Sequence, residues 1–220
     1  MLLFFQHIRK MKKIQFLPLI CALLLTFLGG FGDAYTYIIR DGTFAAMQTG
    51  NLIKFFVFLA EGNFRLNLLL PIFFFCLGAF LATLMSKMKY GQTVALISMF
   101  IITLSASFCP QEEAWNIVCV CALSIAGAMQ FVVFHNYLNY RYASTMATNN
   151  MKLLSESIAE RNLSKFLFYF SIIVTFSIGV VAGAFISKLI GIYAVAAVSI
   201  LFVVVFILRF FIQEEDKKEA

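Results

Sequence analysis

Thr49-Gly50-Asn51 recurs 99 residues later as Thr148-Asn149-Asn150. Each copy lies in a weakly apolar break between two strongly apolar runs. The flanking residues repeat as well, because Ala60-Glu61-x-Asn63 returns as Ala159-Glu160-x-Asn162 at the same offset. This duplication predicts one three-helix unit used twice. Such duplicated units with polar interruptions are common among proteins that move solutes across membranes.

The composition is that of a membrane protein. Of the 220 residues, 62% are hydrophobic and 13% are charged, about half of the roughly 25% charged share of soluble domains. The net charge of +6 does not indicate nucleic-acid binding. The lysines and arginines lie between apolar runs rather than in one patch, which is the pattern that membrane topology produces.

Six apolar runs have, or nearly have, the length of about 20 residues that a membrane-spanning helix needs. They lie at about 15–39, 66–86, 92–109, 115–138, 166–187 and 191–212. A further apolar segment, 47–60, is short and contains Lys54, and its counterpart 146–160 carries three charged residues. Neither segment is therefore expected to span the membrane.

The positive charges favour one topology. With six spans and the N-terminus inside, 13 lysines and arginines fall on the inner side and four fall on the outer side. We therefore expect one membrane domain (1–220) with both termini cytoplasmic and an uncleaved first span, with translation starting at Met1 or Met11. Because three spans separate the units, repeat one (about 14–109) and repeat two (about 115–212) are expected to be inverted.

The two breaks are candidate solute-binding elements. Irregular backbone at membrane depth persists only where it is buried in protein or faces water. Threonine, asparagine and glycine favour helix starts and turns, so each break is expected to begin a polar half-helix. Two helix N-termini at a shared cavity would offer N–H donors to an anionic or polar solute. The alternative is a capped surface helix in a loop. The expected solute contacts are Thr49, Asn51, Thr148 and Asn150, with Gly50 and Asn149 shaping the breaks.

Asp33 is the most informative single residue, because it follows Gly29-Gly30-Phe31-Gly32 inside the first apolar run. A carboxylate at this depth costs on the order of 3 kcal/mol and usually faces the bundle interior. At an offset of 97, Asp33 aligns with Gln130, and the two are expected to face each other across the halves. Asp33 is a candidate proton or cation site. The alternative is a buried helix cap, or a partner for Arg40 or Lys54.

Small residues at four-residue spacing form one stripe in each half. They are Gly78, Ala82 and Ser86 in the first half and Thr175, Gly179, Gly183 and Ser187 in the second. Small residues let helices approach closely, so the stripes are expected to serve packing. The same surface could form a homodimer through Gly179 and Gly183.

No catalytic signature is present in the sequence. The phosphate-binding G-x-x-x-x-G-K-[ST] loop, H-E-x-x-H and G-x-S-x-G are all missing, and the five cysteines do not have metal-ligand spacing. The sequence therefore predicts neither an enzyme nor a metal or cofactor site.

The combined pattern resembles a known family. The residues that carry it are Gly30-x-x-Asp33-Ala34, Phe44 with Thr49-Gly50-Asn51, Gly127-Ala128-Met129-Gln130, and Tyr142 with Thr148-Asn149-Asn150. They resemble the YoaK-like family of bacterial multi-pass membrane proteins of unknown function, over nearly the whole chain. The resemblance implies a multi-pass protein of the bacterial cytoplasmic membrane and adds no substrate. Asn149 stands where that family often has glycine, and asparagine tolerates the left-handed backbone conformation well.

These observations predict an all-α integral membrane bundle of six spans, in two inverted three-span repeats with two polar half-helices. The expected function is a small-solute transporter or channel with proton coupling through Asp33. Its expected partners are the lipid bilayer and an unidentified small polar solute, without nucleic acid. One alternative is a membrane-embedded scaffold or regulatory subunit that transports nothing. Another is an intramembrane enzyme using Asp33 and His135.

Overall fold

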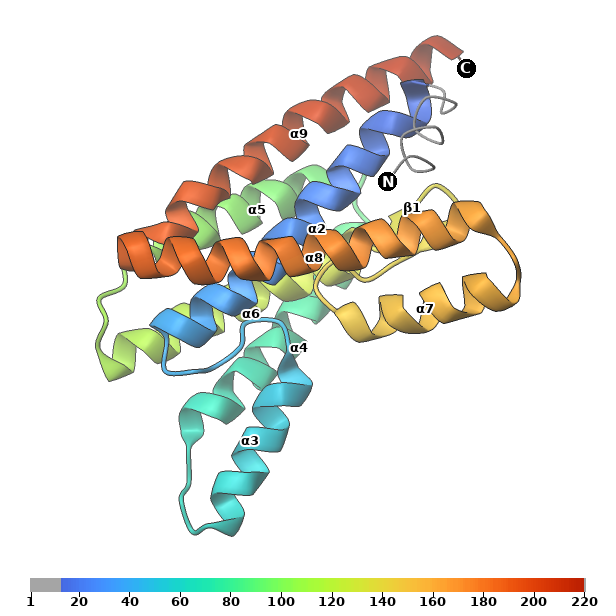
Figure 1. Ribbon diagram of the computed structural model, residues 1–220. Helices are drawn as coiled ribbons and strands as arrows, with labels where there is room; N and C mark the ends of the chain where they lie inside the picture. The colour runs from blue at the N-terminus through green and yellow to red at the C-terminus, as the bar shows by residue number, and fades with distance from the viewer. Residues whose placement is uncertain (1–12, 220) are drawn as a thin grey trace.

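The computed structural model describes residues 13–219, which form a bundle of helices with one short hairpin (Figure 1). The all-α class is confirmed. The elements are α2 (Lys13–Ile39), α3 (Gln48–Ala60), α4 (Leu66–Ser86), α5 (Gly91–Ala106), α6 (Glu113–Val133), β1 (Asn136–Tyr137), β2 (Tyr140–Arg141), α7 (Ala147–Ala159), α8 (Leu163–Ile190), the 3-10 turn η1 (Gly191–Tyr193) and α9 (Ala194–Glu219). The two candidate start residues and the N-terminal charges Arg9, Lys10 and Lys12 lie outside the described residues.

Four helical stretches are long and apolar enough to cross a membrane: Phe16–Ile39, Leu66–Ser86, Glu113–Val133 and Leu163–Ile212. The last is 50 residues long and contains α8, η1 and most of α9. The apolar helix α5 has 16 residues, about 24 Å, which is shorter than the roughly 30 Å hydrocarbon core of a bilayer. The chain therefore has the helices of a membrane protein, with four candidate spans by length and composition.

All six predicted apolar runs are helical, and the two short segments predicted as half-helices are α3 and α7, of 13 residues each. Several boundaries differ by a few residues. The run predicted at 115–138 is helical only to Val133. Beyond it the chain turns through a hairpin in which Asn136 pairs with Arg141 and Tyr137 pairs with Tyr140.

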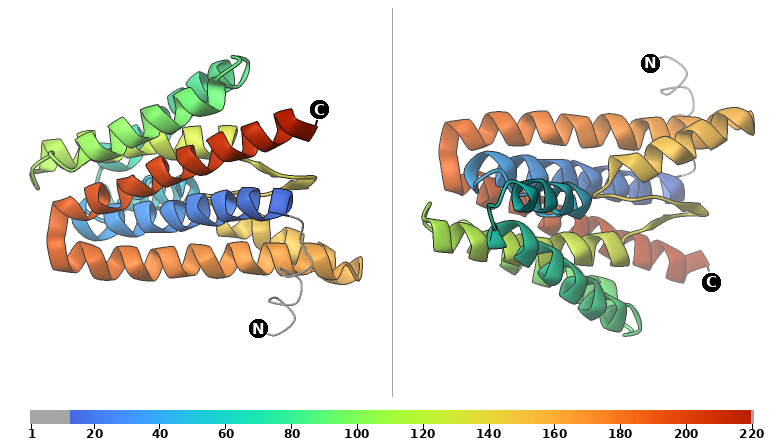
Figure 2. Two further views of the ribbon diagram at one scale, coloured as in Figure 1. Left: turned by 90° about the horizontal axis from the view of Figure 1, so that it is seen from above. Right: turned by 90° about the horizontal axis from the view of Figure 1, so that it is seen from below.

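The two halves of the chain pack through corresponding helix pairs. α2 lies along α8, and α4 lies along α6; α2 also contacts α9, as α6 contacts α5. α3 packs on α4 as α7 packs on α8, and α5 meets α9. Figure 2 shows α2 between α8 and α9. Exchanging α2 with α6, α3 with α7, α4 with α8 and α5 with α9 therefore leaves this set of pairs unchanged.

Close helix contacts depend on glycine. A Cβ on Gly30 would lie 2.3 Å from the Phe176 carbonyl oxygen of α8, and one on Gly179 would lie 2.2 Å from the Phe27 carbonyl oxygen of α2. Gly183 meets the Phe31 carbonyl oxygen in the same way at 2.7 Å. The stripe of α8 thus packs on α2 within the chain. A homodimer through Gly179 and Gly183 would have to displace α2.

The inner helices of the bundle are α2 and α6. Within their apolar windows, 56% and 61% of the residues are buried, compared with 22% for α4 and 28% for the α8–α9 stretch. α2 and α6 carry Asp33 and Gln130, so the two polar residues lie on the helices with the least exposed surface.

Candidate functional site

Each break before a short helix is fixed by one asparagine side chain. The Phe44 N–H donates to Asn51 Oδ1 at 2.9 Å, and Asn51 Nδ2 donates to the Phe44 carbonyl at 2.8 Å. In the second half the Ala143 N–H donates to Asn150 Oδ1 at 3.0 Å, and Asn150 Nδ2 donates to the Ala143 carbonyl at 2.7 Å. The repeated asparagine therefore makes the same paired contact with the residue seven positions earlier.

The remaining donor of each amide is also bonded within the chain. Asn51 Nδ2 reaches Gln48 Oε1 at 2.9 Å, and Asn150 Nδ2 reaches the Met146 carbonyl at 3.0 Å. Both asparagines are fully buried. The helix starts lie at Gln48 and Ala147, and neither helix is capped by a side chain of the residue before it. The asparagines therefore position the breaks from inside the first helical turn rather than as N-caps.

The other predicted contact residues lie elsewhere on the short helices. Thr49, Thr148 and Asn149 are exposed on the surfaces of α3 and α7, away from the central cavity described below. Gly50 is packed, because a Cβ there would lie 3.1 Å from the Phe44 ring and 3.0 Å from the Met47 side chain. The duplication identified the correct segments, but it did not indicate which face of each segment points inward.

Asp33 lies at the N-terminus of α3, across the first break. Its Oδ1 accepts hydrogen bonds from the Ala46 N–H at 2.7 Å and from the Met47 N–H at 3.4 Å. A carboxylate is stabilised at a helix N-terminus, where N–H groups lack partners within the helix. The alternative interpretation of Asp33 as a buried helix cap therefore applies to its Oδ1 atom. Oδ2 is different, because it is buried and has no hydrogen-bond partner.

Gln130 holds the second break from the equivalent position on α6. Its Nε2 donates to the Ser144 hydroxyl at 3.1 Å and to the Leu25 carbonyl of α2 at 2.8 Å. The aligned residues Asp33 and Gln130 therefore have corresponding structural roles, because each joins an inner helix to the break of its own half.

A central cavity of about 50 Å³ lies between the two breaks. Its polar lining residues are Asp33, Thr103, Gln130 and Thr145, so the structure brings together the predicted pair. The hydroxyl of Thr145 is buried without a partner, like Asp33 Oδ2. Such a volume holds one or a few waters or a small ion, and a larger solute would need the cavity to expand. The sequence analysis missed Thr145, which takes the place of Ala46 in the repeat.

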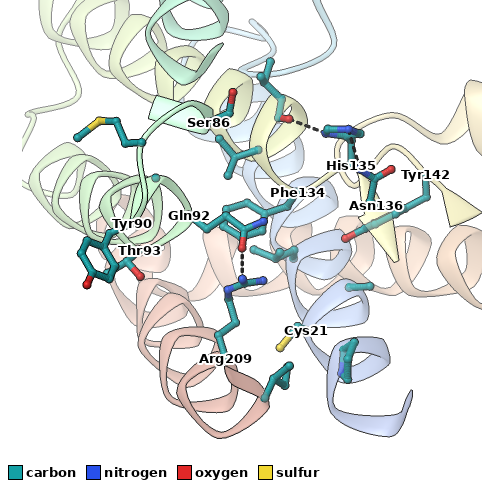
Figure 3. A pocket seen from close by; sticks show the side chains of 18 of the residues that line it. Cys21, Ser86, Tyr90, Gln92, Thr93, Phe134, His135, Asn136, Tyr142 and Arg209 are labelled. Carbon is teal, nitrogen blue, oxygen red and sulfur yellow. Dashed lines mark hydrogen bonds between the residues drawn. The ribbon is translucent and has the colours of Figure 1, made fainter. Parts of the chain in front are cut away.

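A larger pocket, here called the Arg209 pocket, opens at the end of the bundle where α2 begins (Figure 3). Its volume is about 540 Å³. Leu25 and Val133 line it, and one helical turn further on Leu28 and Gln130 line the central cavity. This pocket therefore approaches the central cavity from one end of the bundle.

Polar side chains from three parts of the chain meet in the Arg209 pocket (Figure 3). Arg209 of α9 donates through Nη2 to Gln92 Oε1 of α5. The His135 ring accepts from Asn136 Nδ2 at 2.9 Å on Nε2, and its Nδ1 lies 2.6 Å from the Val132 carbonyl, which fits a neutral ring protonated on Nδ1. Burial raises the pKa of the Tyr142 phenol far above its ordinary value, so this side chain is a neutral hydroxyl.

The opposite end of the bundle is closed by a buried arginine. The Arg40 guanidinium donates through Nη1 to the Pro110 carbonyl at 2.8 Å and to Asn116 Oδ1 at 2.9 Å, and through Nη2 to the Cys109 carbonyl at 2.9 Å and to the Tyr35 hydroxyl at 3.0 Å. It joins the end of α2 to the segment between α5 and α6. Asp41, the next residue in the sequence, accepts a hydrogen bond from the same asparagine, Asn116, at 2.9 Å.

The Arg40 contacts lie beside a second open pocket. Asp41 and Asn116 line that pocket, which has a volume of about 700 Å³. The Tyr35 hydroxyl also donates to the Ile192 carbonyl at 3.3 Å, which ties in the turn between α8 and α9. The Arg209 pocket therefore comes within one helical turn of the central cavity, and the Arg40 contacts close the other end of the bundle. Among the described residues no group of three or more histidine, cysteine, aspartate or glutamate side chains is placed to hold a metal ion.

Comparison with known proteins gives one match. A family model described as "Protein of unknown function (DUF1275)" matches residues 21–208. No curated protein and no solved structure matches the chain. The matched range includes both breaks, the central cavity and Arg40, and it ends one residue before Arg209.

Proposed function

Because the chain belongs to the DUF1275 family of proteins of unknown function, we propose a function from its own residues: a carrier that moves a small polar solute across the bacterial cytoplasmic membrane. The observation that carries the proposal is the central cavity between the two breaks, into which Asp33 and Thr145 bring buried oxygen atoms without partners. Buried polar groups without partners are uncommon and need an explanation. A transported proton or cation would provide one.

We propose six spans in two inverted repeats, with both termini in the cytoplasm. Helices α2, α4, α5, α6, α8 and α9 coincide with the six apolar runs, and the distribution of lysine and arginine supports this orientation. The exchangeable helix pairs support the repeat, because a two-fold axis in the membrane plane would produce such a set of contacts. α5 would span by tilting little and relying on local thinning of the bilayer.

The transport mechanism that fits these features is alternating access. Shifted by the 97 residues that separate Asp33 from Gln130, the pocket residues Ala22 and Leu138 correspond to Cys119 and Asp41, which lie beside Arg40. The repeat equivalent of the open Arg209 pocket is therefore the sealed Arg40 end. Carriers built from inverted repeats expose a fixed central site to one side at a time by moving one repeat against the other. In the proposed cycle, Arg40 closes the outer end while the Arg209 pocket is open to the cytoplasm.

The test is the accessibility of a cysteine placed at Thr145 in a chain whose native cysteines have been replaced by serine. Water must reach the central site of a carrier, so Thr145→Cys is expected to react with a small water-soluble thiol reagent in membranes. Thr26→Cys is the matched control, because Thr26 is equally buried but lines neither the central cavity nor the Arg209 pocket. If neither introduced cysteine reacts, the result would favour the alternative, a membrane scaffold without transport.

A further inference from the structure

We propose that the Arg209 pocket binds a small anion through a carboxylate or phosphate group held by the Arg209 guanidinium. The proposal rests on the proposed function, because it names the chemical class of the solute that the pocket would admit. The proposal depends on residues outside both breaks, and a binding experiment can test it without measuring transport.

The charge of the pocket points to an anion. Lys89 and Arg209 both line it, and none of its lining residues in the described part of the chain is an aspartate or glutamate. His135 also lines the pocket and adds no negative charge. A cleft lined by one sign of charge concentrates ligands of the opposite sign.

Arg209 is held in place for such a contact. Its Nη2 donates to Gln92 Oε1, and its Cζ lies 5.7 Å from the centre of the Phe134 ring. The side chain is half-buried, and it forms no ion pair with any carboxylate whose side chain the structure describes. A guanidinium has five N–H donors in a planar fork that matches carboxylate and phosphate oxygens. Gln92 accepts one of them and fixes the plane, which leaves other donors for a ligand.

The size and the remaining lining restrict the ligand to a small molecule. A volume of about 540 Å³ lies in the range of small-molecule sites, roughly 300–1,000 Å³. Ser86, Thr93 and Asn136 add neutral polar groups, whereas Leu25, Val133 and Ile212 are apolar. This lining fits an anion with a short, partly apolar body. The same head-group chemistry occurs in a free carboxylate or phosphate and in the phosphate of an anionic lipid.

The test measures the melting temperature of the purified full-length protein with three probes. Succinate and inorganic phosphate are titrated in detergent at constant ionic strength against chloride. Phosphatidylglycerol is compared with phosphatidylcholine in nanodiscs. A bound ligand stabilises the folded protein by mass action, so a saturable rise reports binding. The variants are Arg209→Gln and Arg209→Lys. The matched control is Arg141→Gln, which removes the same charge from an exposed arginine outside the pocket.

The proposal expects a saturable rise with at least one probe, in the wild type and in Arg141→Gln alike. Losing a charged hydrogen-bond donor should weaken binding in Arg209→Gln roughly tenfold or more. Arg209→Lys should fold and bind with intermediate affinity, because lysine keeps the charge but not the fork. A rise with succinate or phosphate identifies a soluble anion, and a rise with phosphatidylglycerol alone identifies a lipid head group.

Two results would overturn the proposal: no saturable rise with any probe, or the same apparent Kd in wild type and Arg209→Gln. Either result leaves the carrier proposal standing if Thr145→Cys is labelled. Conversely, Arg209-dependent binding with an unreactive Thr145→Cys would retain the anion site and remove the carrier.

Discussion

Asn150 repeats, in the second half of the chain, the two hydrogen bonds by which Asn51 pairs with the main chain of the residue seven positions earlier. The correspondence covers donor, acceptor and sequence spacing. It gives the duplicated motif a structural role in holding a loop against the start of a short helix. It also accounts for the recurrence of asparagine directly after Thr49-Gly50 and after Thr148-Asn149.

Truncating either asparagine should therefore destabilise the protein to a similar degree. Asn51→Ala leaves the part-buried N–H and carbonyl of Phe44 without these partners, and Asn150→Ala does the same to the buried groups of Ala143, at a cost of about 2–4 kcal/mol in the free energy of unfolding. Thermal melts of the purified variants measure the effect. Thr49→Ala is the control, because Thr49 is exposed and should change the melting temperature little. A loss confined to one asparagine would contradict the equivalence of the two breaks.

Asp33→Asn should separate the structural role of the carboxylate in capping α3 from its proposed role in proton coupling. Asparagine keeps an oxygen for the Ala46 N–H, so the cap on α3 and the melting temperature should be retained. It cannot bind and release a proton, so solute-driven proton flux in proteoliposomes should fall to background. The solute used is whichever probe anion stabilises the wild type. Unchanged proton flux in Asp33→Asn would remove Asp33 from the coupling mechanism.

Arg40→Gln should open the sealed end of the bundle. Cys119 is fully buried beside Arg40, and both side chains donate to the Ala106 carbonyl, at 3.6 Å and 3.4 Å. In a chain that retains only Cys119, the substitution should raise its reaction rate with a membrane-impermeant maleimide added from the outer side. A roughly tenfold higher reaction rate corresponds to a loss of about 1.4 kcal/mol in the free energy that favours the closed state. Arg65→Gln, an exposed arginine at the same end, should leave the rate unchanged.

Two neighbouring glycines of α2 should respond in opposite directions to the same change. Gly30→Ala places a Cβ 2.3 Å from the Phe176 carbonyl oxygen, which forces α2 and α8 apart and should cost about 1–3 kcal/mol. Gly32→Ala meets no atom within 4 Å, so the helix gains from the better propensity of alanine, by about 0.5–1 kcal/mol. Paired melts of the two variants decide whether the α2–α8 contact is as close as described.

Local sequence signals predicted the helices well. Apolar runs separated by polar breaks located α2, α4, α5, α6, α8 and α9, and the duplicated motif located α3 and α7. These features depend on residues close together in the chain. The end of α6 at Val133 was missed, because no glycine or proline between Phe134 and Leu138 marks a helix end, while the hairpin depends on strand pairing.

The site was predicted less completely, because it depends on contacts between distant segments. The alignment of Asp33 with Gln130 identified two of the polar residues at the central cavity. Thr145 breaks the repeat and was missed, and Thr49 and Thr148 follow the repeat but face outward. The burial of Arg40 was not predicted, because most of its partners lie about 70 residues further along the chain. A loop arginine carries no local signal that it will be buried.

The packing of α2 along α8 has a consequence for biosynthesis. α2 is made early, but more than a hundred residues must be translated before α8 can cover its glycine face. At roughly 5–20 residues per second, the nascent first helix waits on the order of 10 s for that partner. During that interval lipids or the insertion machinery must occupy the face of α2 that carries Gly30, and they have to leave before α8 can dock there.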